Sequence, residues 1–250
     1  MRDIDKYRQD YINNQKFEDV LVKYRRKKTI DFLNQNNPKQ IIELGCATES
    51  AVDDYFKNRK KNSNANNIEW IIIEPSKEFI ATTKTKTSYK RTIFLNNFFE
   101  EVDLSELNIS SDTSIVCAGL LHEIPLIDKF IKQLKVACNF GAKCHVSVPN
   151  SNSLHRIIGL EMNILNALTD LSDRNKSFQQ NRVFSSESLR NLLINNHMRI
   201  VEEGGYFIKP FTHKQMEAID FLDDKILDGL YRAGEKYPDL ATEVFVNFTK

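Results

Sequence analysis

Short apolar runs and helical periodicities alternate along most of the chain. The apolar runs suit strands buried on both faces of a sheet. They lie at residues 40–44, 71–73, 92–95, 113–118 and 143–148. Two more strands are expected at residues 198–208 and 241–249, the first interrupted by Gly204 and Gly205 as a bulge or turn.

Helical patterns occupy the segments between these runs. From Phe17 the apolar residues recur at i, i+3, i+4 and i+7, which predicts a helix running toward Pro38. Further helices are expected at residues 51–56, 76–83, 126–140, 157–171, from 185 or 186 onward, and 215–234. Strands that alternate with helices in this way predict an α/β fold.

The segment between residues 39 and 75 carries the clearest chemical signal. The first apolar run leads into Gly45, which permits a sharp turn, and Ser50 can cap the helix that follows. The second run ends at Glu74, whose carboxylate can accept hydrogen bonds from ribose hydroxyls. Strand, tight turn, helix, strand and acid form the layout of a Rossmann-type nucleotide site. An ordinary strand–turn–helix crossover is the alternative.

This pattern resembles the class I S-adenosylmethionine-dependent methyltransferases, whose first strand ends in an acidic-x-Gly-x-Gly-x-Gly loop. Glu43, Gly45 and Cys46 match that loop, whereas Ala47 and Glu49 stand where glycines are usual. Alanine is a mild change if its φ is negative, and Glu49 adds a charge near the carboxylate end of the ligand. The resemblance implies a seven-stranded, mostly parallel sheet with its last strand antiparallel, helices on both faces and a small helical cap.

The resemblance also implies S-adenosylmethionine as the cofactor. Phe98 would cover the adenine ring, although Phe98 and Phe99 could equally be core residues. The residues expected at the cofactor are Glu43, Gly45, Cys46, Ala47, Glu74, Pro75, Asn97, Phe98, Ala118 and Leu120.

Two histidines are candidates for the base that a hydroxyl acceptor would need. His122 follows the fourth strand and His155 follows the fifth, so both are expected at the carboxyl edge of the sheet. A capping or packing role is the alternative for each of them. Glu123 could orient a base, bind substrate or cap a helix.

Segments 149–159 and 204–210 resemble a bacterial subgroup associated with methylation of sugars and other components of surface polysaccharides. The implied acceptor is a small polar molecule such as a sugar, or a nucleotide-linked or phosphorylated glycan precursor. Guanidinium groups suit such anions, although a solvated surface role is the alternative for each arginine. The residues expected at the substrate are Tyr24, Glu123, Asn150, Arg156, Arg182 and Tyr206.

Residues 1–38 are expected to form a helical arm or lid, and residues 39–250 the cofactor-binding domain, with a helical cap near residues 153–182. The basic run at residues 23–28 is either a solvated helix face or a contact to an anionic substrate.

The formal net charge of +1 gives no basis for a nucleic-acid partner. The four cysteines form no CxxC pair, so we expect reduced core thiols and no metal site. No apolar run approaches the roughly 20 residues of a membrane span, and no signal peptide is evident, so a cytoplasmic location is expected. The oligomeric state stays open.

These observations favour an O-methyltransferase that acts on a small polar acceptor. An N-methyltransferase on an amino sugar or amine is an alternative that needs less base catalysis. A third hypothesis is a methyltransferase-like binding protein that has lost its cofactor, because Ala47 and Glu49 depart from the loop pattern. A NAD-linked dehydrogenase fits the later motifs less well.

Overall fold

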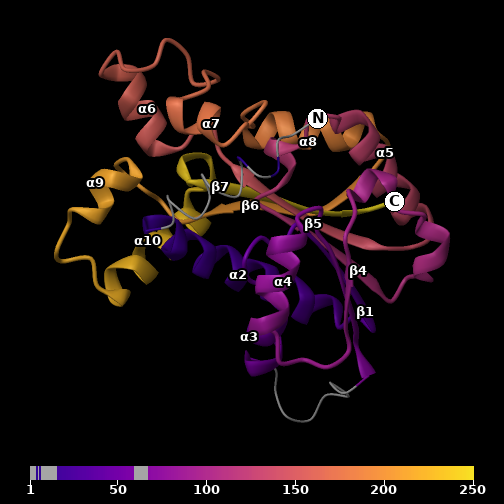
Figure 1. Ribbon diagram of the computed structural model, residues 1–250. Helices are drawn as coiled ribbons and strands as arrows, with labels where there is room; N and C mark the ends of the chain where they lie inside the picture. The colour runs from indigo at the N-terminus through magenta and orange to yellow at the C-terminus, as the bar shows by residue number, and fades with distance from the viewer. Residues whose placement is uncertain (1–3, 5, 7–15, 59–66) are drawn as a thin grey trace.

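A seven-stranded sheet forms the centre of the computed structural model (Figure 1), which describes residues 4, 6, 16–58 and 67–250. The strands are β1 (Gln40–Leu44), β2 (Glu69–Ile73), β3 (Thr92–Leu95), β4 (Thr113–Ala118), β5 (Lys143–Pro149), β6 (Arg199–Tyr206) and β7 (Glu243–Thr249). Their order is β3-β2-β1-β4-β5-β7-β6, and β7 runs antiparallel to both of its neighbours. The sheet confirms the expected fold class, and all seven predicted strands are present.

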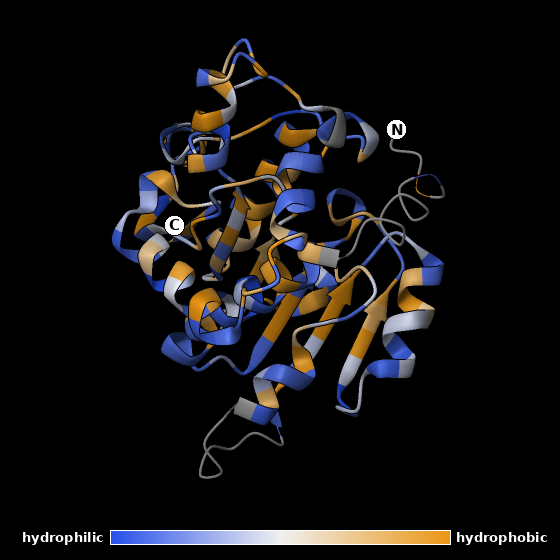
Figure 2. Cartoon of the chain, turned by 90° about the vertical axis from the view of Figure 1, so that its left-hand side faces the viewer, coloured by the Kyte–Doolittle hydropathy of each residue, from blue (hydrophilic) through white to orange (hydrophobic). Residues whose placement is uncertain are grey.

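Helices lie on both faces of the sheet. They are α2 (Lys16–Asn36), α3 (Val52–Asn58), α4 (Lys77–Lys86), α5 (Ile127–Asn139), α6 (Leu154–Glu161), α7 (Asp173–Ser177), α8 (Ser186–Asn195), α9 (His213–Glu217) and α10 (Asp224–Lys236). In Figure 1, α6 and α7 lie together above the sheet, in the region expected to form a cap. Figure 2 shows apolar strands at the centre and helices with many polar positions around them.

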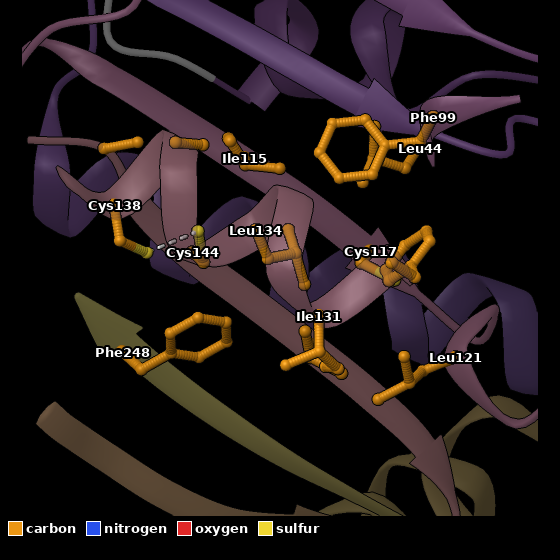
Figure 3. Close-up of a cluster of buried hydrophobic side chains, with 14 of the residues drawn as sticks. Leu44, Phe99, Ile115, Cys117, Leu121, Ile131, Leu134, Cys138, Cys144 and Phe248 are labelled. Carbon is orange, nitrogen blue, oxygen red and sulfur yellow. Dashed lines mark hydrogen bonds between the residues drawn. The ribbon is translucent and has the colours of Figure 1, made fainter. Parts of the chain in front are cut away.

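Three clusters of buried side chains hold these layers together. One joins the sheet to α5 and α8 and includes Cys138 and Cys144, whose Sγ atoms are 3.6 Å apart (Figure 3). The second packs α2 and α3 against the opposite face around Trp70. The third joins the first half of α2 to α9, α10 and the end of β6. Because α2 contributes to the second and third clusters, it packs both against β1, β2 and α3 and against the C-terminal helices α9 and α10.

Two predicted helices have the wrong extent. The helix predicted at 157–171 ends at Glu161, and the helix predicted at 215–234 is divided into α9 and α10. The Asp223 side chain accepts a hydrogen bond from Ile226 N at 2.8 Å, so it caps a new helix inside the expected one.

Gly204 and Gly205 do not interrupt their strand, contrary to the prediction. Both pair with β7, and the register irregularity lies earlier, between Ile200 and Glu202. A Cβ on Gly205 would lie 2.6 Å from the Cβ of Ala241, so glycine is needed there for close packing.

Candidate active site

A cavity of about 1350 Å³ lies at the carboxyl ends of β1, β2 and β4. Its wall includes Gly45 after β1, Glu74 after β2 and Gly119 after β4, together with one side of α2. Open α/β sheets bind ligands at this edge, where the strand order reverses. In this sheet the reversal falls between β1 and β4, so the cavity occupies the expected position.

The loop after β1 turns through two left-handed residues. Gly45 has φ +71° and Ala47 has φ +48°. A Cβ on Gly45 would lie 3.1 Å from Leu120 Cδ2, so this position favours glycine on both grounds. The positive φ of Ala47 means that alanine is not the mild change considered from the sequence.

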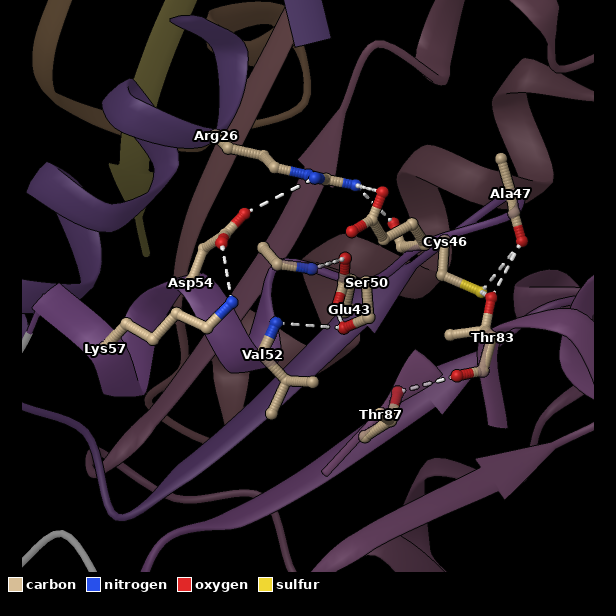
Figure 4. A network of polar contacts seen from close by, with 12 residues as sticks. Arg26, Glu43, Cys46, Ala47, Ser50, Val52, Asp54, Lys57, Thr83 and Thr87 are labelled. Atoms are coloured by element: carbon tan, nitrogen blue, oxygen red, sulfur yellow. Dashed lines mark hydrogen bonds and ion pairs between the residues drawn. The ribbon is translucent and has the colours of Figure 1, made fainter. Parts of the chain in front are cut away.

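Glu43, near the end of β1, is hydrogen-bonded to the residues that follow this loop (Figure 4). Its buried carboxylate accepts hydrogen bonds from the Ser50 hydroxyl and from Ala51 N at 3.1 Å. It also accepts from Trp70 Nε1 at 2.9 Å. Burial raises the pKa of Glu43, although these donors and Arg26 act in the opposite direction. The carboxylate therefore ties β1 to the start of α3.

Arg26 of α2 holds the other side of the loop. Its guanidinium donates to Glu49 O at 2.9 Å and forms ion pairs with Glu49 at 3.4 Å and Asp54 at 3.3 Å. The charge of Glu49 is thus paired with a cation of the same chain. Sequence reasoning placed Arg26 in a basic run but could not assign it this partner.

Glu74 lies at the end of β2 and in the cavity wall. Its carboxylate accepts from Ser76 N at 2.9 Å and from Ala47 N at 3.4 Å, so it joins the first and second strand ends. Pro75 and Phe98 also line the cavity. Asn97 is outside the lining residues, and its side-chain oxygen accepts from Phe98 N at 2.9 Å.

Cys46, Ala118 and Leu120 complete the predicted cofactor residues that line the cavity. Burial raises the pKa of the Cys46 thiol. The Thr83 hydroxyl supports the loop by donating to Ala47 O at 3.0 Å. Thr83 was not expected at the site, because nothing distinguishes it within a predicted helix.

The basic run of α2 is partly solvated: Lys23 and Lys27 are exposed, whereas Arg25, Arg26 and Lys28 are half-buried. Lys23 pairs with Asp224 at 2.7 Å and Lys28 with Glu235 at 2.8 Å. The ammonium of Lys27 lies 4.4 Å from the centre of the Tyr231 ring. These contacts attach α2 to α10.

Arg25 is the cation of this run that lies deepest in the wall. Its guanidinium forms ion pairs with Glu243 and with Glu18, the latter at 3.0 Å, and a Cβ on Gly119 would lie 2.9 Å from Arg25 Nε. Burial lowers the pKa of Arg25, but the two carboxylates raise it well above its ordinary value. The Tyr206 hydroxyl donates to the same Glu243 at 2.5 Å.

Neither candidate histidine is among the described residues that line the cavity. His122 is buried, and its Nε2 lies 3.7 Å from Glu123 Oε1. His155 is half-buried, and its Nδ1 lies 3.1 Å from Ser153 Oγ. Burial, followed by Lys209, His213 and Arg156, lowers the pKa of His155 to about 2. At neutral pH His155 is therefore uncharged and a poor proton acceptor.

The predicted substrate residues divide into two groups. Tyr24 and Glu123 line the cavity, and the Tyr24 hydroxyl donates to Asp228 at 2.9 Å. Asn150, Arg156, Arg182 and Tyr206 are outside its lining residues.

Two of the residues outside the lining make contacts that order the chain. The Arg156 guanidinium donates to Leu168 O at 2.8 Å and to Asp170 O at 2.6 Å, which fixes the segment between α6 and α7. The Asn150 amide donates to Ala241 O at 2.9 Å and so attaches the end of β5 to the start of β7.

Within residues 16–58 and 67–250 no group of three or more His, Cys, Asp or Glu side chains could hold a metal ion. No helix in these ranges is long and apolar enough to cross a bilayer.

The fold matches solved S-adenosylmethionine-dependent methyltransferases. One is the plantazolicin methyltransferase BamL in complex with a triazolic desmethylPZN analogue and S-adenosylhomocysteine (TM-score 0.52, 13% identity, 97% of this chain and 95% of that chain). Another is the 1,6-didemethyltoxoflavin-N1-methyltransferase of Burkholderia thailandensis (TM-score 0.56, 12% identity, 98% and 87%). A methyltransferase from Clostridium acetobutylicum is also similar (TM-score 0.54, 11% identity, 91% and 91%).

At these identities the likeness establishes the fold, which is that of the class I methyltransferases. No protein-family model matches the sequence, and no curated protein matches it. The resemblance to the polysaccharide subgroup stays a prediction.

Proposed function

We propose that the protein is an S-adenosylmethionine-dependent methyltransferase that acts on a small polar acceptor. The observation that carries this proposal is the cavity at the ends of β1, β2 and β4, with Gly45 and Glu74 in its wall. The methyltransferase fold supports it because the cavity lies at the edge where that fold binds ligands.

The wall fits the proposed cofactor. Glu74 can accept hydrogen bonds from ribose hydroxyls, and Phe98 can cover an adenine ring. The left-handed turn at Gly45 and Ala47 lets the backbone approach the amino-acid end of S-adenosylmethionine. A cavity of about 1350 Å³ is larger than the usual ~300–1,000 Å³ of small-molecule sites, so an acceptor has room beside the cofactor.

The bound cofactor would supply an electrophilic methyl group on a sulfonium. The chain would contribute orientation and exclusion of water, since the reaction is an in-line displacement. Packing of α2 across the cavity supports this role, because Arg26 and Arg25 fix the helix to the β1 loop and to β7.

A hydroxyl acceptor on a sugar or glycan precursor is the finer form of the proposal, suggested by residues 149–159. It needs a base, for which His122 and His155 are the candidates from the sequence. An amine acceptor is the second candidate, and one observation favours it: neither histidine is among the described residues that line the cavity. If the pH dependence of the rate is unchanged in His122→Ala and His155→Ala, the amine is supported.

Calorimetric titration with S-adenosylmethionine and S-adenosylhomocysteine tests the cofactor. We expect micromolar binding that Glu74→Gln weakens about 10- to 100-fold, because a hydrogen bond to a charged group contributes roughly 1.5–3 kcal/mol. Glu69→Gln is the matched control. Glu69 lies at the opposite end of β2 and accepts from Gln40 Nε2, so its removal leaves the cavity intact. Absence of binding to the folded wild type would support the binding-protein hypothesis instead.

A further inference from the structure

The cavity wall is acidic. Its described lining residues include eleven Asp and Glu side chains against six Lys and Arg side chains, a formal excess of five negative charges. The chain as a whole has a net charge of +1, so the acidic excess is local. A cleft lined mainly by one sign of charge concentrates ligands of the opposite sign.

Three of the six cations of the wall are already paired with carboxylates. Lys23, Arg25 and Arg26 each form an ion pair with a carboxylate of the same chain. Lys27, Lys86 and Lys129 are exposed, and Lys27 lies over the Tyr231 ring. At Lys23, Arg25 and Arg26 an anionic acceptor would have to displace a carboxylate of the same chain, which costs the energy of breaking that pair.

Three carboxylates of the wall are buried: Glu43, Glu74 and Glu123. Glu43 and Glu74 accept backbone N–H groups of the loops around β1 and β2. Glu123 lies 5% exposed in the short 3-10 helix Leu121–Glu123 after β4, on the other side of the strand-order reversal. It therefore brings a buried carboxyl group, in contact with Gln180 Nε2 at 3.4 Å and His122 Nε2 at 3.7 Å, to the wall of the cavity after β4.

Thr29 provides an independent observation. It lines the same cavity at 2% exposure, and its hydroxyl oxygen has no hydrogen-bond partner within the described residues. A buried hydroxyl without a partner costs free energy, which a ligand N–H or O–H group can recover. Thr29 lies one helical turn after Arg25, the side chain that approaches Gly119 after β4, so Thr29 is on the side of α2 that faces this end of the sheet.

We infer that the acceptor is a small amine that enters the cavity as a cation and is bound by Glu123. This inference rests on the proposed methyltransferase function and names its substrate class. An ammonium group complements the acidic wall, whereas phosphorylated and carboxylated acceptors meet its excess of five formal negative charges.

The reaction balances with no further reactant. The ammonium first loses a proton to water, which frees the nitrogen lone pair. That pair forms the new bond to the methyl carbon as the carbon–sulfur bond breaks, and the bonding electrons remain on sulfur. The products are the methylated ammonium, neutral S-adenosylhomocysteine and the released proton.

The charge of the acceptor can be measured before its identity is known. A small-molecule extract of cells is separated at pH 7 on cation and anion exchangers, and each fraction receives the protein and S-adenosylmethionine with a tritiated methyl group. We expect the label in the cation-exchange fraction, and we expect treatment of that fraction with acetic anhydride to abolish labelling. Labelling of the anionic or the unretained neutral fraction would overturn the inference while leaving the methyltransferase proposal intact.

Labelling of no fraction by protein that binds S-adenosylmethionine would count against the methyltransferase proposal and, with it, against this inference. With an active fraction, Glu123→Gln should raise the KM for the acceptor at least tenfold and leave the Kd of S-adenosylmethionine unchanged. Asp112→Asn is the matched control. It removes a carboxylate that pairs with Lys39 at the opposite edge of the sheet, so KM should not change. An equal KM for wild type and Glu123→Gln would exclude Glu123 as the binding residue.

Discussion

Ala47 has a left-handed backbone, which costs an L-residue with a Cβ roughly 1–2 kcal/mol relative to glycine. Ala47→Gly removes this strain, while the extra freedom of glycine in the unfolded chain offsets part of the gain. We therefore expect the free energy of unfolding to rise by up to about 1 kcal/mol. Urea denaturation of the two proteins measures the difference.

The control for this substitution is Ala81→Gly. Ala81 is an exposed residue inside α4, where glycine should lower the free energy of unfolding by about 1 kcal/mol. If both variants are destabilised equally, the positive φ of Ala47 is not a source of strain.

The residues around Ala47 show how far a sequence specifies a site. Gly45 and Glu74 could be placed because each directly follows a recognisable apolar run. The partners of Arg25 could not, because Glu243 lies 218 residues away in sequence and nothing local marks the pair. His122 and His155 were correctly placed after strands, but strand ends do not determine which side chains reach a cavity.

Helix α2 is attached to the C-terminal part of the chain by pairs of very different burial. The Glu243 side chain is 2% exposed, pairs with Arg25 and accepts a hydrogen bond from Tyr206. The Glu235 side chain is 38% exposed and pairs with Lys28. Removal of one partner from a buried pair leaves an uncompensated charge and costs roughly 3–5 kcal/mol, against about 0–1 kcal/mol for an exposed pair.

Glu243→Gln should accordingly lower the free energy of unfolding by about 3 kcal/mol, and Glu235→Gln by less than about 1 kcal/mol. Chemical denaturation of both variants gives the comparison directly. Equal small losses would mean that Glu18 alone compensates the charge of Arg25.

The boundaries of elements were predicted less well than their existence. The periodicity at 215–234 continues through Asp223, so the pattern predicted one helix where capping by Asp223 produces two. At Gly204 and Gly205 the sequence suggested a bulge, because glycine serves both turns and close packing and only the neighbouring Ala241 and Phe245 decide between them.

At the scale of the whole molecule, the C-terminal strand β7 is held inside the sheet by contacts with residues far away in the sequence. Strand β7 inserts between β5 and β6 and carries Asn247 into the core, where its side-chain oxygen lies 2.7 Å from His145 Nδ1. His145 is 0% exposed and packs between Phe32 and Phe245. Asn247 donates in turn to Glu202 on β6 at 2.8 Å, so His145 lies in a polar contact that crosses three strands.

This position makes the stability of the whole fold dependent on pH. Burial lowers the pKa of His145 from 6.5 to about 4, although Asn247 acts in the opposite direction. The unfolded chain therefore binds this proton first as the pH falls. The stabilisation is fully present above pH 6.5 and is lost as the pH falls toward about 4, by about 3 kcal/mol in total.

His145→Gln removes the titrating group and leaves an amide that can still reach Asn247. We expect the free energy of unfolding of this variant to fall less than that of the wild type between pH 7 and pH 5, measured by urea denaturation at each pH. The carboxylates titrate in both proteins, so their contribution cancels in the difference. His197→Gln, at an exposed histidine, should retain the wild-type loss. If His145→Gln also retains it, protonation of His145 does not limit the stability of the fold in acid.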